Sequence, residues 1–193
     1  RLRAATRDLS RSSKLITHND ELRYSLHKMC NETTVITRKT WGMTQKNIIL
    51  IGAPVDSGKR ARGCLMGPDA FRTAGLSDAL SALGHTVIDQ GNLAPAPVRV
   101  SPPTNRAVHE LATTVGWTQT LIQAAREAAP KGLPIFLGGD HALSLGSVAG
   151  MAAHAAMLDR PLFVLWLDAH TDFHTPDTSR SGNLHGTPLG YVT

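Results

Sequence analysis

The sequence lacks the features that mark membrane proteins and disulfide-rich proteins. Its longest apolar run, Pro161 to Leu167, is far shorter than the roughly 20 residues that a membrane-spanning helix needs. Its two cysteines, Cys30 and Cys64, stand far apart without a CxxC spacing, which disfavours a disulfide framework and a structural zinc site. With a hydrophobic fraction of 41% over 193 residues, the chain is expected to be a soluble, cytoplasmic protein with one buried core and no membrane partner.

Basic residues are not in excess in the part of the chain that is expected to fold. Residues 1–46 hold ten Lys or Arg against four Asp or Glu, whereas residues 47–193 hold ten against eleven, so the net charge of +5 comes from the amino-terminal segment. A nucleic-acid-binding protein would carry its basic patch within the folded domain. We therefore expect no nucleic-acid partner.

The amino-terminal segment, residues 1–42, is rich in Arg, Ser and Thr and shows weak periodicity. A mitochondrial transit peptide has this composition, and Arg1 to Lys14 fit it. Acidic residues interrupt the pattern further along, and Met43 directly precedes the first convincing strand. We favour a natural start at Met43, with residues 1–42 as a non-native or disordered leader and residues 43–193 as the folded part.

From Lys46 onward, short apolar runs alternate with longer stretches of helical periodicity. The run Asn47 to Ile51 is almost wholly apolar, as expected of a strand that is buried on both faces of a parallel sheet. Repetition of strand, helix and strand predicts an α/β fold with a mainly parallel sheet. We expect strands at 47–51, 85–88, 134–137 and 162–167, helices at 67–84, 106–129 and 144–158, and a proline-rich loop at 92–105.

Polar motifs follow three of these predicted strands. Gly-Gly-Asp-His at 138–141 follows the third strand, and Asp-Ala-His-Thr-Asp at 168–172 follows the fourth. In open α/β sheets, ligands bind beyond the carboxyl ends of the strands, so both motifs are expected at one rim. Residues 56–58, which follow the first strand, are expected to form a loop at that rim.

The spacing of Asp168, His170 and Asp172 is typical of a metal site. In an extended chain all three side chains would point to one face over about 13 Å, which is too far for one ion. A bend, or a pair of ions bridged by carboxylates, would resolve the mismatch. Carboxylates and imidazole without thiolate favour Mn²⁺ over structural zinc. The alternative is a solvated strand end whose Asp and His cap a helix, and His141 at a neighbouring strand end favours the metal site.

Three motifs, in this order, resemble those of arginases in the ureohydrolase superfamily. They are Gly-Gly-Asp-His-Ala-Leu-Ser-Leu-Gly-Ser from Gly138, Leu-Asp-Ala-His-Thr-Asp-Phe-His-Thr-Pro from Leu167, and Ser-Gly-Asn-Leu-His-Gly-Thr-Pro from Ser181. Agmatinases share the Asp-x-His-x-Asp core but typically lack Ser-Gly-Asn-Leu-His-Gly. The resemblance spans about Lys46 to Thr193. It implies a three-layer α/β fold, with helices on both faces of a mainly parallel sheet, of which this chain holds the amino-terminal portion, truncated at the carboxyl end.

The resemblance implies a site for two Mn²⁺ ions that hydrolyses the guanidinium group of L-arginine to give L-ornithine and urea. Its metal ligands in this sequence would be His141, Asp168, His170 and Asp172. His141 would bind one ion, His170 the other, and the carboxylates would lie between or beside them. Two cations favour deprotonated water, which is a nucleophile at neutral pH. His185 stands where the family places its proton shuttle, and an imidazole can protonate the leaving amine.

The resemblance also implies that the loop before His185 holds the amino-acid end of the substrate. By position, the substrate-binding residues are His174, Ser179, Ser181 and Asn183. Hydroxyl and amide groups can donate to a carboxylate without adding charge beside the bound cations. His174 is a departure, because animal arginases usually have Asn there. Its imidazole could donate as Asn does, or add positive charge when protonated.

Arginases supply further metal carboxylates from an Asp-x-Asp-x-x-Asp-Pro segment and a later Glu, whereas here the one acidic residue after Asp172 is Asp177. Four protein ligands do not satisfy two ions that each prefer about five or six donors. We expect the protein to be an arginase, and a homo-oligomer when full length. Because its set of metal ligands is incomplete, the 193-residue chain alone is expected to be inactive. Two alternatives stay open: a related amidinohydrolase acting on agmatine or a guanidino acid, and a non-catalytic metal-binding or assembly module.

Overall fold

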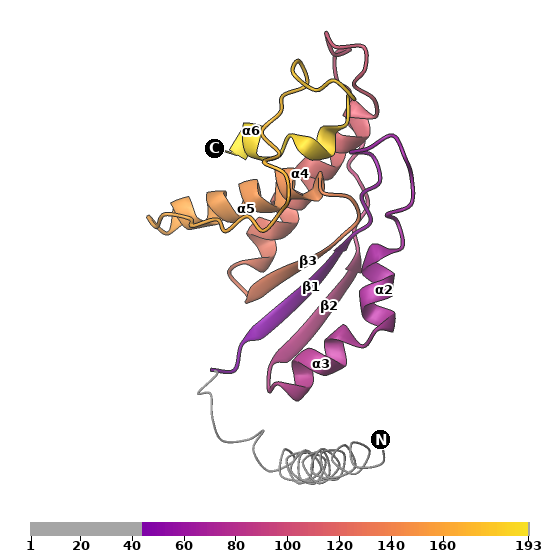
Figure 1. The fold of residues 1–193 in the computed structure, drawn as a ribbon. Coiled ribbons are helices and arrows are strands. Elements are labelled where there is room, and N and C mark those ends of the chain that lie inside the picture. The colour runs from indigo at the N-terminus through magenta and orange to yellow at the C-terminus, as the bar shows by residue number, and fades with distance from the viewer. Residues whose placement is uncertain (1–43, 193) are drawn as a thin grey trace, which may run out of the picture. The chain divides into compact units, whose positions relative to one another are not determined.

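The structure is a computed structural model that describes residues 44–192 (Figure 1). The predicted leader, residues 1–42, lies outside the described residues. The elements within them are β1 (Asn47–Ala53), α2 (Gly67–Thr73), α3 (Leu76–Ala82), β2 (Thr86–Asn92), α4 (Leu111–Ala128), β3 (Leu133–Gly138), α5 (Leu143–Met157), the 3₁₀-helix η1 (Leu184–Gly186) and α6 (Leu189–Val192). Within residues 44–192, no helix has both the length and the apolar character to cross a bilayer.

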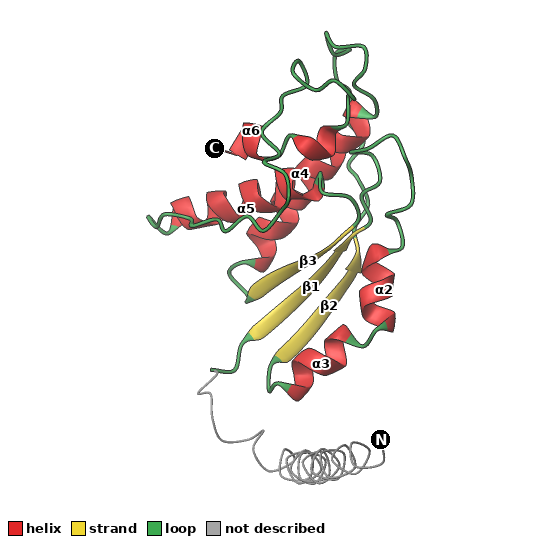
Figure 2. Cartoon of the chain, viewed as in Figure 1, coloured by secondary structure: helices red, strands yellow, loops and turns green. Residues whose placement is uncertain are grey.

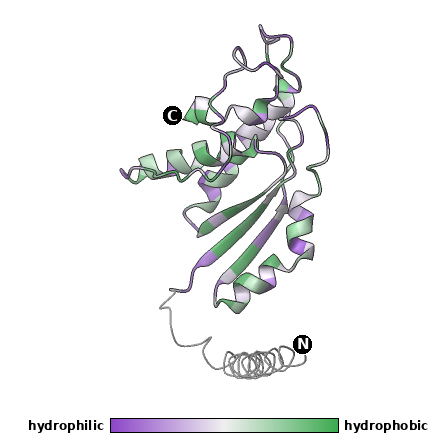
Figure 3. Ribbon diagram, in the orientation of Figure 1, coloured by the Kyte–Doolittle hydropathy of each residue, from purple (hydrophilic) through white to green (hydrophobic). Residues whose placement is uncertain are grey.

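The strands form a parallel sheet in the order β2-β1-β3 (Figure 2). β1 is central, and its residues from Ile48 to Ala53 are all buried. A central strand with a layer on each face has no solvent side, which explains the continuous apolar run. β2 is an edge strand and is mostly exposed and hydrophilic (Figure 3). Arg72 of α2 pairs with Asp89 of β2 through two hydrogen bonds of 2.7 and 2.9 Å.

Alternate side chains of β1 pack against helices on opposite faces of the sheet. Ile48 and Leu50 lie in one cluster with two leucines of α3. Ile49 and Ile51 lie in another with Ala128 of α4. Because successive side chains of a strand point to opposite faces, both faces are covered. The predicted α/β fold with helices on both faces of a parallel sheet is thereby confirmed.

The predicted strand at 162–167 is wrong. This segment forms no strand, and Phe163, Leu165 and Leu167 are 88%, 71% and 86% exposed. A strand that is apolar on both faces needs neighbouring strands and a layer on each side, and no described strand pairs with it. The apolar pattern indicates that the segment needs neighbouring strands and helices to bury it, but the pattern does not supply those neighbours.

The predicted helix at 67–84 is two helices, because Gly75 separates α2 from α3. Gly75 has a φ of 81°, in the left-handed region where a helix ends and where glycine is favoured. The other predicted helices are present with shifted bounds: α4 begins at Leu111 and α5 at Leu143. The proline-rich stretch after β2 is a loop, as expected.

Candidate metal centre

The Gly-Gly-Asp-His motif is held against the end of the central strand. It directly follows β3, and two backbone bonds connect it to the chain that leaves β1: Gly139 N–H donates to Ala53 (3.3 Å) and Asp140 N–H donates to Val55 (2.7 Å). A Cβ at position 139 would lie 2.2 Å from the Val55 carbonyl oxygen, so only glycine permits this approach. The motif thereby places His141 at the carboxyl rim of the sheet.

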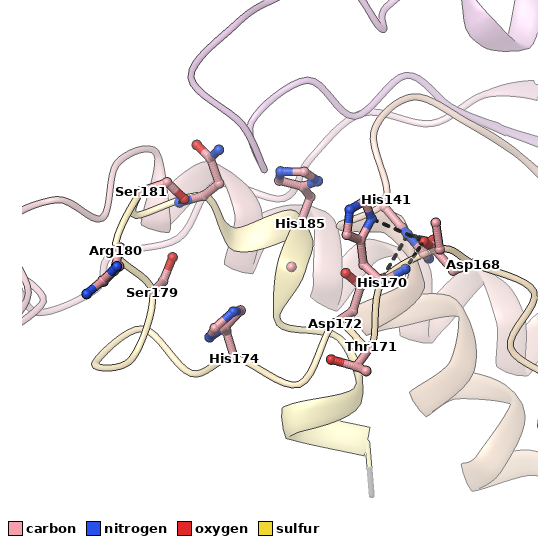
Figure 4. A pocket seen from close by; sticks show the side chains of 13 residues that line it. His141, Asp168, His170, Thr171, Asp172, His174, Ser179, Arg180, Ser181 and His185 are labelled. Atoms are coloured by element: carbon pink, nitrogen blue, oxygen red, sulfur yellow. Dashed lines mark hydrogen bonds and ion pairs between the residues drawn. The ribbon is translucent and has the colours of Figure 1, made fainter.

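Three predicted ligands meet at this rim (Figure 4). His141 Nδ1 lies 2.9 Å from Asp168 Oδ2 and 3.2 Å from Asp172 Oδ2. One ligand atom from each of the three residues lies within 4.8 Å of the others. The structure therefore brings together His141 and Asp172, which are 31 positions apart in sequence, although the strand predicted before Asp168 does not form.

The chain bends through the Asp-x-His-x-Asp motif, which resolves the span of an extended segment. Asp168 Oδ1 accepts the backbone N–H of His170 at 2.9 Å, and Asp172 adopts a φ of 47°. The hydrogen bond from the His170 N–H, followed by the nearby imidazoles of His141 and His170, lowers the pKa of Asp168. The charged form of this carboxylate is therefore favoured at its position.

Asp172 carries the buried oxygen of the cluster. Asp172 is 8% exposed. Its Oδ2 lies 3.2 Å from His141 Nδ1 but has no hydrogen-bond partner. Backbone bonds fix its position: Leu189 N–H donates to the Asp172 carbonyl at 2.9 Å, and His174 N–H donates to that of Gly186 at 3.1 Å. A buried carboxylate oxygen without a donor is destabilising unless a cation satisfies it.

His170 lies beside this three-residue cluster. Its side chain is 84% exposed, and its Nδ1 lies 3.5 Å from Asp168 Oδ1. The two oxygens of Asp168 thus face different histidines, His141 on Oδ2 and His170 on Oδ1. The role of His170 as a ligand to a second ion stays a prediction.

The predicted catalytic and substrate residues line the same cavity as the cluster. The cavity has a volume of about 680 Å³, and its wall includes His174, Ser179, Ser181, Asn183 and His185. His185 lies in η1, and its backbone N–H donates to the Gly58 carbonyl at 2.9 Å. The predicted rim loop at 56–58 therefore directly contacts the segment that carries His185, which is called the histidine loop below.

Residues 174–183, the predicted substrate-binding loop (the substrate loop), use some of their polar side chains in hydrogen bonds within the loop. Ser179 is buried and its Oγ accepts from Gly182 N–H at 3.1 Å, whereas Ser181 Oγ accepts from Asn183 N–H at 3.2 Å. Asn183 Oδ1 accepts from the Arg60 N–H at 3.1 Å. Both serine hydroxyls keep their hydrogens as donors, and Asn183 keeps its amide NH₂ group.

His174 and the neighbouring backbone complete the loop. His174 Nδ1 lies 3.4 Å from Thr178 Oγ1. Asn105 donates from Nδ2 to the carbonyl groups of Pro176 (2.7 Å) and Ser179 (2.8 Å), which ties the loop to the segment before α4. These contacts hold the loop over the cavity without using a secondary-structure element.

Trp166 and Arg180 are site residues that the sequence reasoning missed. The Trp166 ring stacks on the His141 imidazole, with centroids 4.8 Å apart and planes 15° apart. Its position two residues before Asp168 is a usable signal, because residues i and i+2 of an extended chain share a face. Arg180 stands between Ser179 and Ser181 in the sequence and also lines the cavity, where it adds a positive charge.

Comparisons with known proteins identify the family of this chain. The family model described as "Arginase family" matches residues 46–193. The chain is 51% identical over 144 residues to the arginase of Brucella melitensis, covering 75% of this chain and 47% of that protein. It is 53% identical over 149 residues to the arginase of Agrobacterium fabrum, covering 77% and 46%. The chain thus spans about half the length of these relatives.

Solved structures give the same result. A crystal structure of arginase from Bacillus subtilis matches with a TM-score of 0.63 and 38% identity, covering 75% of this chain and 47% of that one. The arginase of Bacillus caldovelox matches with a TM-score of 0.64 and 36% identity, covering 75% and 48%. By its match to the family model, its identity to these relatives and its fold, the chain belongs to the arginase family.

Proposed function

We propose that the protein acts as an Mn²⁺-dependent arginase that hydrolyses L-arginine to L-ornithine and urea. The observation that carries this proposal is the cluster of His141, Asp168 and Asp172, which opens into the same cavity as His185 and the substrate loop. Family membership supports the reaction, and an arginase of Entamoeba histolytica that matches with a TM-score of 0.64 and 26% identity is described in complex with L-ornithine.

The residues present fit a divalent cation. The buried Oδ2 of Asp172 has no hydrogen-bond partner, and the donors are oxygen and imidazole nitrogen, which suit Mn²⁺. Asp168 faces His141 with one oxygen and His170 with the other, an arrangement that suits a carboxylate between two ions. His141, Asp168 and Asp172 would hold one ion, and His170 with Asp168 would contribute to a second.

The chain's own residues would divide the chemistry between the metal cluster and His185. Bound cations would supply the positive charge that favours deprotonation of water near neutral pH. His185 can hold a proton on its imidazole and pass it to the departing amine, because its backbone, fixed at Gly58, leaves the ring on the cavity wall. This imidazole would protonate the ornithine nitrogen as the carbon–nitrogen bond breaks.

The substrate loop would bind the amino-acid end of arginine. Ser181 and Asn183 can donate from the hydroxyl and the amide NH₂ to a carboxylate, and the Arg60 N–H fixes which end of the Asn183 amide is available. Ser179 and His174 line the same wall. Arg180 adds a charge that favours an α-carboxylate. Cytoplasmic location and homo-oligomer formation stay predictions.

The test measures urea and ornithine release by the protein expressed from the complete reading frame, with L-arginine or agmatine and with Mn²⁺ or EDTA. We expect turnover of arginine that requires Mn²⁺, and much slower turnover of agmatine, which lacks the α-carboxylate. Equal rates with agmatine would favour the related amidinohydrolase. Binding of Mn²⁺ without turnover of either substrate would favour a non-catalytic module.

A further inference from the structure

A buried carboxylate lies directly before the metal-binding histidine and is not a member of the cluster. Asp140 is 4% exposed. Its Oδ1 accepts the N–H of Ala142 at 2.9 Å, and its Oδ2 accepts the N–H of Gly58 at 2.8 Å. Hydrogen bonds to an ionised carboxylate are stronger than those between neutral groups. Asp140 therefore ties its own loop to the loop that follows β1, which is 82 positions earlier in the sequence.

Gly58 passes this connection to the histidine loop. Its N–H donates to Asp140, while its carbonyl accepts the N–H of His185 at 2.9 Å. One residue thus touches both the carboxylate beside His141 and the backbone of His185. A Cβ at position 58 would lie 2.5 Å from Asp140 Oδ1 and 2.7 Å from the Ala142 Cβ. The close contact leaves no space for a larger residue.

We propose that Asp140 is a positioning residue that, through Gly58, sets where His185 stands relative to the His141 cluster. A local role at the start of α5 accounts for the bond to Ala142 but not for the long-range bond to Gly58. The reaction needs a proton donor and a metal cluster in fixed register, because a displacement of about 1 Å can lower a rate by about 10²-fold. This inference rests on the proposed role of His185 in proton transfer.

A carboxylate suits this position better than an amide. Asp140 offers one acceptor oxygen to each of two N–H donors. In Asp140→Asn, one of these donors would face the NH₂ group of the amide, and a buried N–H would lose its acceptor. The variant keeps the shape of the side chain and breaks one bond.

The loop offers a matched control. Asp56 is also buried, at 5% exposure, and its carboxylate accepts the N–H groups of Gly63 and Cys64 at distances of 3.1 to 3.2 Å. Asp56 also lies 3.9 Å from Lys59 Nζ. Asp56→Asn therefore makes the same chemical change in the same loop without removing either hydrogen bond of Gly58. It reports general loosening of the loop.

The experiment measures amide hydrogen exchange of His185 by NMR in the metal-free 193-residue chain. We expect Asp140→Asn and Gly58→Ala to speed exchange at His185 about tenfold or more relative to a core amide of α4, and Asp56→Asn to change it less than about twofold. Unchanged exchange in both test variants, or an equal increase in Asp56→Asn, would overturn the proposal.

Two further readouts complete the test. In the unsubstituted chain, the Gly58 and His185 amides should open with the same free energy, distinct from that of Gly63, and independent opening would contradict the connection even if the variants fail to fold. In the active protein, Asp140→Asn should lower kcat about tenfold or more with little change in KM or Mn²⁺ affinity. A parallel loss of Mn²⁺ would make Asp140 a support of the metal loop alone. Absence of arginine turnover in the parent protein would refute the proposed function and leave the exchange result standing.

Discussion

Asp172→Asn is expected to stabilise the metal-free protein and to destabilise it, relative to the parent protein, when Mn²⁺ is present. Asp172 Oδ2 is buried and makes no hydrogen bond, and the Asp168 carboxylate lies in the same cluster. The two carboxylates share one imidazole nitrogen of His141, so neutralising Asp172 relieves the repulsion between them. Asn tolerates the left-handed conformation at φ 47° as Asp does, so the backbone is not strained by the change.

The magnitude in the absence of metal follows from the buried oxygen. An unsatisfied buried polar group costs about 1–3 kcal/mol, so the variant should gain about 1 kcal/mol in the free energy of unfolding. For a domain of this size, that gain raises the Tm by about 2–4 °C.

The magnitude with metal follows from mass action. At Mn²⁺ 100-fold above Kd, binding to the folded state stabilises the parent protein by about 2.7 kcal/mol. A unit charge interacts with another unit charge 4 Å away by about 4 kcal/mol at an effective dielectric of 20, so its loss should raise Kd about 100-fold or more. At the same Mn²⁺ concentration the variant then gains only about 0.4 kcal/mol. The order of the two Tm values should therefore reverse.

Differential scanning calorimetry in EDTA and in Mn²⁺, with Mn²⁺ affinity measured by electron paramagnetic resonance, tests both halves. Asp177→Asn is the control, because it removes a carboxylate from an exposed site of the same loop that lies outside the cluster. Equal Mn²⁺-induced shifts in the parent protein and Asp172→Asn would refute the assignment of Asp172 as a ligand. A metal-free variant no more stable than its parent would refute the reasoning from the orphaned oxygen.

Three further predictions concern other parts of the chain. His185→Asn should lower kcat for arginine about 10²-fold or more with Mn²⁺ still bound, since general acid–base catalysis is worth about 10²–10⁴, and metal analysis beside kinetics would expose a ligand role instead. Trp166→Ala should weaken Mn²⁺ binding about tenfold by removing the ring that orients His141, whereas Trp166→Phe should largely retain it, and equal affinities in both would dismiss the stack. The Arg72 hydrogen bond lowers the pKa of Asp89 below its ordinary value of 3.8, so this pair stabilises the fold above that pH and loses its effect as pH falls through the lowered pKa. The difference in unfolding free energy between the parent protein and Asp89→Asn, about 0.2–1 kcal/mol for such a partly exposed pair, should shrink below pH 3.8, and denaturant titrations that show no such trend would contradict it.

Much of the scaffold is written in local sequence patterns. The apolar run of β1 needs cover on both faces, and that need alone predicts a central strand of a parallel sheet. The strand before Gly-Gly-Asp-His places this motif at the carboxyl rim of the sheet, as predicted. The structure brings Asp168 and Asp172 to His141 at the same rim, although the strand predicted before them does not form. The residue types of the motifs predict which chemistry the rim can support.

Prediction from the sequence failed where a local pattern needs another segment of the chain to form the predicted structure. Residues 162–167 have the composition of a buried strand, but a strand exists only when another strand pairs with it, and none of the described strands does. Gly75 divides a helix that periodicity alone would continue, because it adopts the left-handed conformation at which a helix ends.

Only the tertiary structure decided the internal geometry of the site. The bend at Asp172, the stacking of Trp166 on His141 and the connection from Asp140 through Gly58 to His185 each depend on contacts between segments or on a backbone conformation that no periodicity encodes. Local sequence determines which side of an element must be buried and which groups its ends present. The partner that buries or binds them lies far along the chain, and its distance and orientation are set by how the whole sheet and its loops pack.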